Sequence, residues 1–402
     1  MGFTTRVSCG SAADLAAGSS ALVGPGVGAP GQFYEDIGAY AFRGTGTDLA
    51  EGSTVEIYRR NAGAHWARVA TSTLTSGAYA ANLPVQAAGT FTFVATSGGA
   101  PGSGDEVSSA PVAVTVEDAR IILNAPVRRI DSLRNPTVSG SIVPARAGVT
   151  IHVDVVRKGK FRLAKTAVTD AAGRYSVVLG YGRRNLATYT LRAAYRAPNR
   201  DRWEKSSQHK FSRIAVLNAV VTETTKDEVA TTYRDGCPVG PSTLRTVTMN
   251  FYGRDKKMHR GVLIIRADLT PEITRGFTRA LDHRFPVAKM YNPNRYGGND
   301  PRQMKANNSS GFNCRKVVGN PYRQSPHSYG IALDVNPVQN PYRDVKGKWW
   351  PSNGKSYIDR TPRRFGMLSK KSHLTKSLRR DDFFWGGFWK PGRDYQHFEY
   401  RP

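Results

Sequence analysis

The chain has 402 residues, 39% of them hydrophobic, which is enough for two or three domains with packed cores, and no apolar run approaches the ~20 residues that span a membrane. Its formal net charge of +27 is uneven, since residues 1–119 carry 5 Lys and Arg against 10 Asp and Glu, whereas residues 120–402 carry 53 against 21. The basic part predicts an anionic partner. We expect no nucleic acid, because zinc-finger spacing, RNA-recognition signatures and basic-helix heptads are missing. An anionic cell-wall polymer or plain solubility explains the scattered cations as well as DNA would.

The first 32 residues are rich in Gly, Ala, Ser and Pro. This composition cannot bury a core, so we expect a disordered leader over 1–32. The leader lacks the ~7–15-residue apolar core of a signal peptide. If the protein is exported, either this start is truncated or misassigned, or export uses another route. Cys9 lies in the leader, and no pattern assigns it a role.

From about residue 33 a unit of roughly one hundred residues occurs twice. Apolar and polar residues alternate in its short segments, as expected of half-buried strands, and its size is that of an Ig-like β-sandwich. We therefore predict two all-β Ig-like sandwich modules, 33–118 and 120–219, which resemble the Ig-like repeats of bacterial surface proteins. The matching positions are Gly44 with Gly140, Gly52 with Gly148, 54–57 with 150–153, 77–79 with 173–175, 91–95 with 189–193, and Ser108 and Ser109 with Ser206 and Ser207.

Neither module contains a cluster of ionisable residues typical of a catalytic site. His65 and His152 are single histidines at positions that are not equivalent in the repeat, which favours structural or solvated roles. We interpret the modules as spacers or wall-binding units. The second module is the more basic of the two, so it is the better candidate to contact an anionic polymer.

After the second module the pattern changes to α+β. The polar stretch 222–234 is interpreted as a linker, and strands are predicted at 244–249 and 262–265. A helix is predicted from Thr270, as its N-cap, with proline at the first helical position and apolar residues every four positions thereafter. We assign 220–402 to one α+β domain.

The decapeptide 325–334 reads SPHSYGIALD and contains two candidate metal ligands, His327 and Asp334. A fully extended chain would separate them by roughly 23 Å, so both reach one metal only if the chain folds back between them. Gly330 permits such a turn. Asp334 is then expected near the end of a buried strand, where a carboxylate is costly unless it is paired or bound to metal.

A second motif, DYQH at 394–397, completes the pattern. Together the two motifs strongly resemble S-x-H-x-x-G-x-A-x-D and (D/E)-x-x-H of the VanY-type zinc D-alanyl-D-alanine carboxypeptidase family. That family includes L-alanyl-D-glutamate endopeptidases and shares its fold with the zinc domain of Hedgehog. The resemblance covers about 230–402, and further matches lie at 307–315, 336–337, 385–387 and 397–399.

The resemblance implies a C-terminal zinc peptidase domain whose metal ligands are His327, Asp334 and His397, with water in the fourth position. Together with the two sandwich modules, it makes the expected fold multidomain. Asp394 would be the general base and then the acid, and Arg315 would lie over the scissile carbonyl or the substrate carboxylate. A carboxylate beside a zinc-bound water suits proton transfer, and a guanidinium suits an oxyanion. Glu399 is the rival base. We also expect substrate contacts from Ser325, Tyr329 and Trp385.

Cys237 and Cys314 flank the candidate catalytic stretch. They form one disulfide if the protein is exported, or remain buried or free thiols if it is not. The sequence does not decide between these alternatives.

The sequence therefore predicts an exported or wall-associated peptidase acting on peptidoglycan stem peptides, with Zn²⁺ as cofactor. A D-alanyl-D-alanine carboxypeptidase is the first expectation, and an L-alanyl-D-glutamate endopeptidase is the enzymatic alternative. The alternative from another class is a non-catalytic wall-binding protein that retains the zinc domain as a scaffold.

Overall fold

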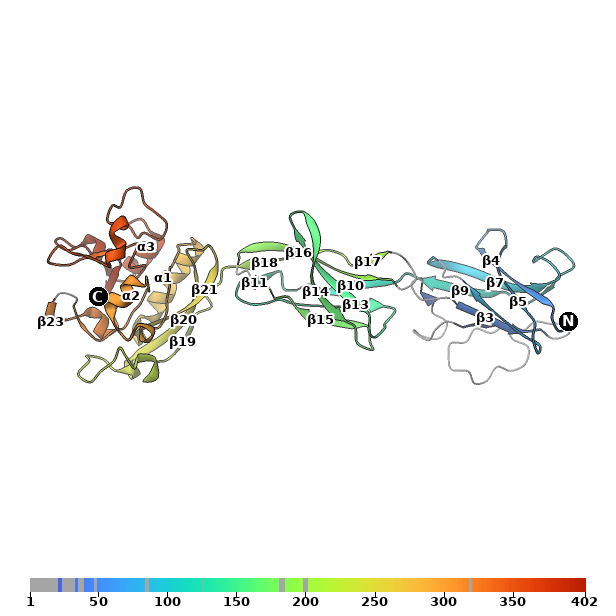
Figure 1. The fold of residues 1–402 in the computed structure, drawn as a ribbon, viewed down its shortest axis with the longest axis horizontal. Helices are drawn as coiled ribbons and strands as arrows, with labels where there is room; N and C mark the ends of the chain where they lie inside the picture. Colours follow the sequence, from blue (N-terminus) through green and yellow to red (C-terminus); the bar gives the residue numbers. More distant parts are fainter. Residues whose placement is uncertain are drawn as a thin grey trace. The chain divides into compact units, whose positions relative to one another are not determined.

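The computed structural model describes residues 21–23, 33–34, 40–46, 49–83, 87–124, 126–180, 185–197, 202–317 and 320–402. Within these residues strands predominate, and the α-helices lie in the C-terminal part (Figure 1). The chain forms two compact units. The first comprises Met1–Arg128, Pro136–Gly180 and Tyr189–Phe211, and the second comprises Arg129–Asn135, Tyr181–Thr188 and Ser212–Pro402.

The first repeat is a sandwich of two sheets around one core. Phe42 and Tyr79 of one sheet pack against Val55, Ile57 and Phe93 of the other, and all five side chains are buried. One sheet has the order β1-β3-β6, formed by Ala21–Val23, Tyr40–Thr45 and Ala78–Leu83. The other has the order β2-β9-β7-β4-β5, formed by Phe33–Tyr34, Val112–Glu117, Gly89–Ser97, Thr54–Asn61 and Ala67–Thr73, with β8 (Val107–Ser108) paired to β7.

The second repeat has the same strand order. Its three-stranded sheet is β10-β12-β15, formed by Arg120–Asn124, Thr137–Val143 and Arg174–Val178. Its larger sheet is β11-β18-β16-β13-β14, formed by Arg129–Asp131, His209–Ile214, Ala187–Arg196, Thr150–Arg157 and Lys160–Val168, with β17 (Trp203–Lys205) paired to β16. The predicted all-β tandem repeat is therefore confirmed strand by strand.

Two local details recur with this topology. The β-bulge between Ile57 and Tyr58 has its counterpart between Val153 and Asp154. The hydroxyl of Ser109 accepts a hydrogen bond from a backbone amide of β7, and Ser206 does the same in β16. The structure therefore pairs Ser109 with Ser206, and the sequence match of the two serine pairs was shifted by one residue.

Apart from Ala21–Val23, the predicted disordered leader lies outside the described residues, and so does Cys9. Ala21–Val23 forms β1, which pairs antiparallel with β3. Further along the described chain, no helix is both long enough and apolar enough to cross a bilayer.

The C-terminal part is α+β, as expected. Its first sheet is antiparallel, in the order β19-β20-β21 (Val220–Glu223, Leu244–Tyr252 and Met258–Arg266), so both predicted strands are present and longer than predicted. Helix α1 (Thr270–Asp282) packs on this sheet and against α3 (His373–Arg380), as Figure 1 shows. The amphipathic pattern explains this packing, because the apolar residues of α1 recur every turn and face the core.

Two local predictions in this region were wrong. The stretch 222–234 is not a linker: it begins within strand β19, Thr224 shares a hydrogen bond with Thr246, and Val229 is fully buried. Thr270 is not an N-cap either. It is the first helical residue of α1, and its hydroxyl donates to the carbonyl of Ala267 in the preceding 3₁₀ turn.

A second antiparallel sheet, β24-β28-β27 (Ala332–Asp334, His397–Tyr400 and Phe383–Trp385), holds two of the three candidate ligands, Asp334 and His397. Its register places Asp334 directly opposite His397. The remaining short strands are β22 (Lys316–Val317), β23 (Asn320–Gln324), β25 (Tyr342–Arg343) and β26 (Trp349–Trp350), and the remaining α-helix is α2 (Asp300–Lys305). The 3₁₀ turns are η1 (Asp227–Val229), η2 (Pro241–Thr243), η3 (Ala267–Leu269), η4 (Pro293–Tyr296), η5 (Pro326–Tyr329), η6 (Ser352–Tyr357) and η7 (Gly386–Phe388).

Candidate metal centre

The segment from His327 to Asp334 folds back on itself, as the spacing requires. His327 lies in the turn η5, which Ser325 caps by accepting a hydrogen bond from the His327 amide (3.3 Å). Gly330 then reverses the chain with φ of 65°. A Cβ at this position would lie 2.8 Å from a methyl carbon of Leu244, so glycine is required both for its φ and for the close approach.

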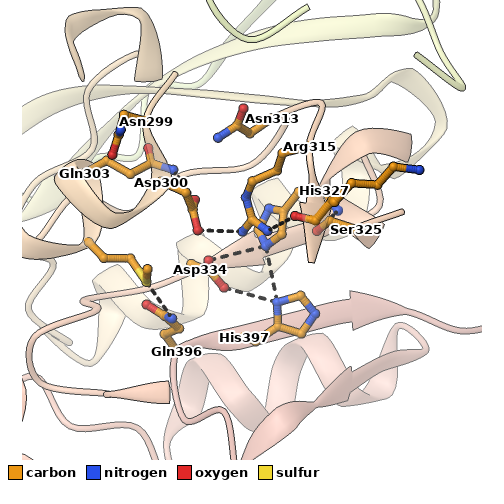
Figure 2. A network of polar contacts seen from close by, with 12 residues as sticks. Asn299, Asp300, Gln303, Asn313, Arg315, Ser325, His327, Asp334, Gln396 and His397 are labelled. Carbon is orange, nitrogen blue, oxygen red and sulfur yellow. Dashed lines mark hydrogen bonds and ion pairs between the residues drawn. The ribbon is translucent and has the colours of Figure 1, made fainter. Parts of the chain in front are cut away.

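Three buried side chains converge where this turn meets β28 (Figure 2). The Oδ2 atom of Asp334 lies 3.3 Å from His327 Nε2, and its Oδ1 atom lies 3.1 Å from His397 Nδ1. The two ring nitrogens are 3.3 Å apart. One ligand atom from each residue lies within 4.8 Å of the others, so the three side chains can share one metal ion.

The outer nitrogen of each imidazole has its own acceptor. His327 Nδ1 donates to the carbonyl of Gly311 (2.6 Å), and His397 Nε2 donates to Glu399 (3.1 Å), whose other oxygen pairs with Arg401. These contacts fix both tautomers and leave His327 Nε2 and His397 Nδ1 free to bind a metal. Two imidazoles and one carboxylate are a ligand set typical of catalytic zinc sites.

The charges of the group favour a cation at its centre. Burial opposes the ionised form of Asp334, but the neighbouring His327 and His397 hold the pKa of that carboxyl well below its usual range. Burial also disfavours a charged His397, yet its hydrogen bonds with Asp334 and Glu399 raise the pKa of that imidazole to about 10. The side chains present therefore fit a metal ion, which would supply the positive charge that a proton otherwise provides.

Asp394 is a buried carboxyl without a complete set of partners. Among the described residues, none makes a hydrogen bond to its Oδ1 atom. Burial is the main cause that raises the pKa of Asp394 above its ordinary value. Its backbone amide donates to the carbonyl of Gly386 (3.1 Å), and a Cβ on that glycine would lie 2.7 Å from the Asp394 carbonyl oxygen. Asp394 is therefore held firmly, with one carboxylate oxygen available.

Glu399, the rival base, has a different environment. It contacts the ring nitrogen of His397 that points away from the other two ligands. Burial raises the pKa of Glu399, but His397 and Arg401 outweigh this and lower it to about 2. A carboxylate that weakly basic is a poor proton acceptor. Its geometry is that of a group that orients His397.

A cavity of about 440 Å³ contains the three candidate ligands and Asp394. Its walls include α2, the turn η5, the segment 389–392 and the end of β28. Charged side chains dominate the lining. The acids are Asp300, Asp334, Asp394 and Glu399, and the cations are Arg315, Arg323, Arg343, Lys390 and Arg401.

Arg315 lines this cavity, but its guanidinium is already paired (Figure 2). Its Nη2 atom lies 2.7 Å from Asp300, a buried carboxylate that also accepts a hydrogen bond from Gln303 (2.7 Å). The sequence reasoning did not identify Asp300. Its only local indication is its position at the start of a short helix, after the capping residue Asn299, and this does not reveal a partner that lies 15 residues further along.

The other predicted residues divide into two groups. Ser325 lines the cavity, whereas Tyr329 and Trp385 do not. Tyr329 ends the turn η5 with 40% of its surface exposed, and the buried indole of Trp385 donates to the carbonyl of Tyr395 (2.9 Å). Contact of Tyr329 or Trp385 with a substrate therefore stays a prediction.

Cys237 and Cys314 are joined by a disulfide, with their Cα atoms 6.0 Å apart. This bond ties the segment before β20 to the residue that precedes Arg315. Of the two alternatives that the sequence left open, the structure has the disulfide.

Comparison with known proteins gives one match to a family model, described as D-alanyl-D-alanine carboxypeptidase, over residues 319–400. This segment contains His327, Asp334, Asp394 and His397 but begins after Arg315. No curated protein matches the chain.

Two solved structures show 16% identity to the chain. One is a tetra-tandem repeat from the extending region of a large adhesion protein. The match includes 58% of this chain and 61% of that structure, with a TM-score of 0.24. Invasin, a bacterial integrin-binding protein, is covered over 47% by 60% of this chain, with a TM-score of 0.23. The chain thus covers less than two thirds of either structure.

Proposed function

We propose that the chain, whose residues 319–400 match the D-alanyl-D-alanine carboxypeptidase family model, is a zinc-dependent peptidase of peptidoglycan that removes the terminal D-alanine of stem peptides. One observation carries the proposal: the buried group His327, Asp334 and His397 opens into a cavity that also contains a partly unpaired carboxyl, Asp394. This combination provides both a metal site and a base.

Hydrolysis of the terminal amide adds water across the C–N bond and releases D-alanine. When bound by His327, Asp334 and His397, zinc supplies Lewis acidity toward the carbonyl and lowers the pKa of water to about 7. Asp394 accepts a proton from the attacking water and donates it to the leaving amine. Burial raises the pKa of Asp394, and the positive charge of a bound metal would favour the ionised form that accepts the proton.

The remaining polar groups orient these participants. The Gly311 carbonyl and Glu399 hold the two imidazoles in one tautomer each. Arg315, held by Asp300, supplies a fixed positive charge in the cavity. Such a charge stabilises either the oxyanion of the tetrahedral intermediate or the terminal carboxylate of the substrate.

Digestion of purified muropeptides by the zinc-loaded chain, followed by mass spectrometry, tests the reaction. Loss of one terminal D-alanine supports the proposal. Release of whole stem peptides would instead identify an L-alanyl-D-glutamate endopeptidase. The Asp394→Asn variant is expected to lose hydrolysis by roughly 10²-fold or more while retaining zinc. A zinc-loaded wild type without activity, or a variant equal to it, would leave only the non-catalytic wall-binding function.

We also propose an exported location at the cell wall. Disulfides such as Cys237–Cys314 persist in oxidising compartments, and the basic segment 120–402 suits anionic cell-wall polymers. In this proposal the modules 33–118 and 120–219 deliver the catalytic domain, 220–402, to its substrate. Fractionation of producing cells checks this, and a chain found only in the cytoplasm with reduced thiols would contradict it.

A further inference from the structure

A second cavity of about 330 Å³ lies in the C-terminal part, lined by the segments 360–370 and 385–395. Its walls carry five cationic side chains and no Asp or Glu. The cations are Arg360, Arg363, Lys370, Lys390 and Arg393. The cavity that holds the candidate metal ligands, called the metal cavity below, differs because four acids also line it and two of its five cations, Arg315 and Arg401, are paired with carboxylates.

The positive charges of the second cavity are not neutralised by the part of the chain that the structure describes. Their polar contacts are with neutral groups: Arg363 donates to the hydroxyl of Ser369 (2.9 Å), and Arg393 donates to the hydroxyl of Tyr395 (3.3 Å). Five like charges around one hollow repel one another, and low-dielectric walls concentrate their field. An anion bound in the hollow would relieve this repulsion.

Arg360 shows the imbalance best, because its guanidinium is half-buried. It donates to the carbonyls of Gln339 (2.7 Å) and Leu368 (2.7 Å) and to the side chain of Asn340 (3.0 Å), and it stacks on the ring of Tyr395 (4.3 Å). All these partners are neutral. Burying a charge without a counter-ion is costly, so a fixed cation in this wall favours an anionic ligand.

The two cavities are neighbours. Lys390 lines both, and Trp389 before it lies against the ring of His397, with centroids 5.2 Å apart. A ligand held in the second cavity is therefore held beside the metal cavity. The proposed function uses only the metal cavity and leaves this charge unexplained.

We propose that the second cavity binds a phosphodiester group of an anionic polymer and thereby holds the metal cavity next to the polymer-bearing surface. Phosphate oxygens point in several directions, and here the cations come from two separate chain segments that surround the hollow. Arginine and lysine are the usual partners of such groups. The inference deepens the proposed wall location by assigning the anionic polymer to one site.

Isothermal titration of the full chain with poly(glycerol phosphate), at constant ionic strength, tests this site. Lys370 is exposed, lines the cavity and has no role in the metal cavity, whereas Lys371 is exposed and does not line the second cavity. Lys370→Glu and Lys371→Glu change the net charge equally. We expect Lys370→Glu to weaken binding about tenfold, because attraction becomes repulsion at close range, and Lys371→Glu to leave it within about twofold.

Equal effects of the two variants, or no binding by the wild type, would overturn the assignment. Polygalacturonate of matched charge serves as the carboxylate probe, and equally tight binding of this probe would overturn the choice of phosphate. Circular dichroism of both variants verifies the fold. Hydrolysis of a short soluble muropeptide is measured in parallel. Polymer binding that persists in an inactive Asp394→Asn chain separates this site from the proposed reaction.

Discussion

The two imidazoles of the candidate metal centre each present a fixed nitrogen, because the outer nitrogen of each ring has its own acceptor. The Gly311 carbonyl holds His327, and Glu399 holds His397. Two further carboxyls near these imidazoles, Glu399 and Asp394, have different environments. Glu399 has a pKa of about 2 and lies behind a ligand, whereas the pKa of Asp394 is raised by burial and one of its oxygens is unpaired.

Replacement of Glu399 tests this division. Glu399→Gln keeps a hydrogen-bond acceptor for His397 but removes the charge, so we expect zinc affinity to fall about tenfold. Competition with a chromogenic chelator measures the affinity. Asp394→Asn is the matched comparison and is expected to lose hydrolysis with little change in zinc affinity. If instead Glu399→Gln abolishes hydrolysis while binding zinc normally, Glu399 is the base.

Among the elements, the turn η5 and strands β24 and β28 assemble the site. The antiparallel register brings Asp334 opposite His397, and the left-handed Gly330 brings His327 to the same place. These elements are short, so their positions depend on contacts with the rest of the domain. The hairpin of β25 and β26 contributes Tyr342 and Arg343 to the cavity wall.

Gly330→Ala tests the turn. The substitution strains the positive φ and pushes a Cβ within 2.8 Å of Leu244, so we expect a loss of about 1–3 kcal/mol in stability and weaker zinc binding. Gly297→Ala is the matched control, since Gly297 has a φ of 67° but open space around its Cβ position. Thermal unfolding and zinc titration measure both. Equal effects would show that the close contact is unimportant.

Asp344, in the hairpin of β25 and β26, is expected to make the stability of the folded protein depend on pH. Asp344 is buried, and burial raises the pKa of its carboxyl. The carboxylate accepts hydrogen bonds from the Trp350 indole (2.9 Å) and from the amides of Lys348 (2.9 Å) and Lys346 (3.0 Å). These hydrogen bonds outweigh burial and hold the pKa below its ordinary value. The unfolded chain therefore binds the proton more tightly, so this stabilisation is complete above the unfolded pKa of ~3.9 and is lost as the pH falls through the lower folded value.

We accordingly expect Asp344→Asn to lower the melting temperature near neutral pH, with a difference from the wild type that shrinks below about pH 4. Melting curves of both proteins between neutral and acid pH provide the measurement. A difference that is constant over this range would mean that the Asp344 carboxylate is not the stabilising species.

At the scale of the whole molecule, the candidate metal site and the two cavities described above lie in the C-terminal domain and not in the repeat modules. The described modules bury apolar cores, with no metal-binding cluster among their described residues. The basic charge of 120–402 includes cations paired with carboxylates, as at Arg315, and cations that no described carboxylate pairs with, as in the second cavity. The disulfide Cys237–Cys314 fixes the chain beside Arg315.

Removal of the disulfide tests its contribution. The double variant Cys237→Ser and Cys314→Ser frees a segment closed over a separation of 77 residues, and we expect a loss of about 2–4 kcal/mol in the stability of the C-terminal domain. Scanning calorimetry measures the change. Zinc binding should persist, because β24 and β28 do not include either cysteine. Identical melting of the variant and the oxidised wild type would exclude a stabilising bond.

Local pattern by itself predicted the strands β20 and β21 and the turn at Gly330, because alternation and turn residues act over a few residues. The tandem repeat followed from self-similarity at a period of about one hundred residues, and the three candidate ligands followed from the resemblance of two motifs to a known family. Tertiary structure decided the rest. Only folding pairs Arg315 with the distant Asp300, joins Cys237 to Cys314, turns Trp385 into the core and places Glu399 behind His397. The same holds for the uncompensated charge around Arg360, since burial and pairing depend on contacts between segments that no local spacing encodes.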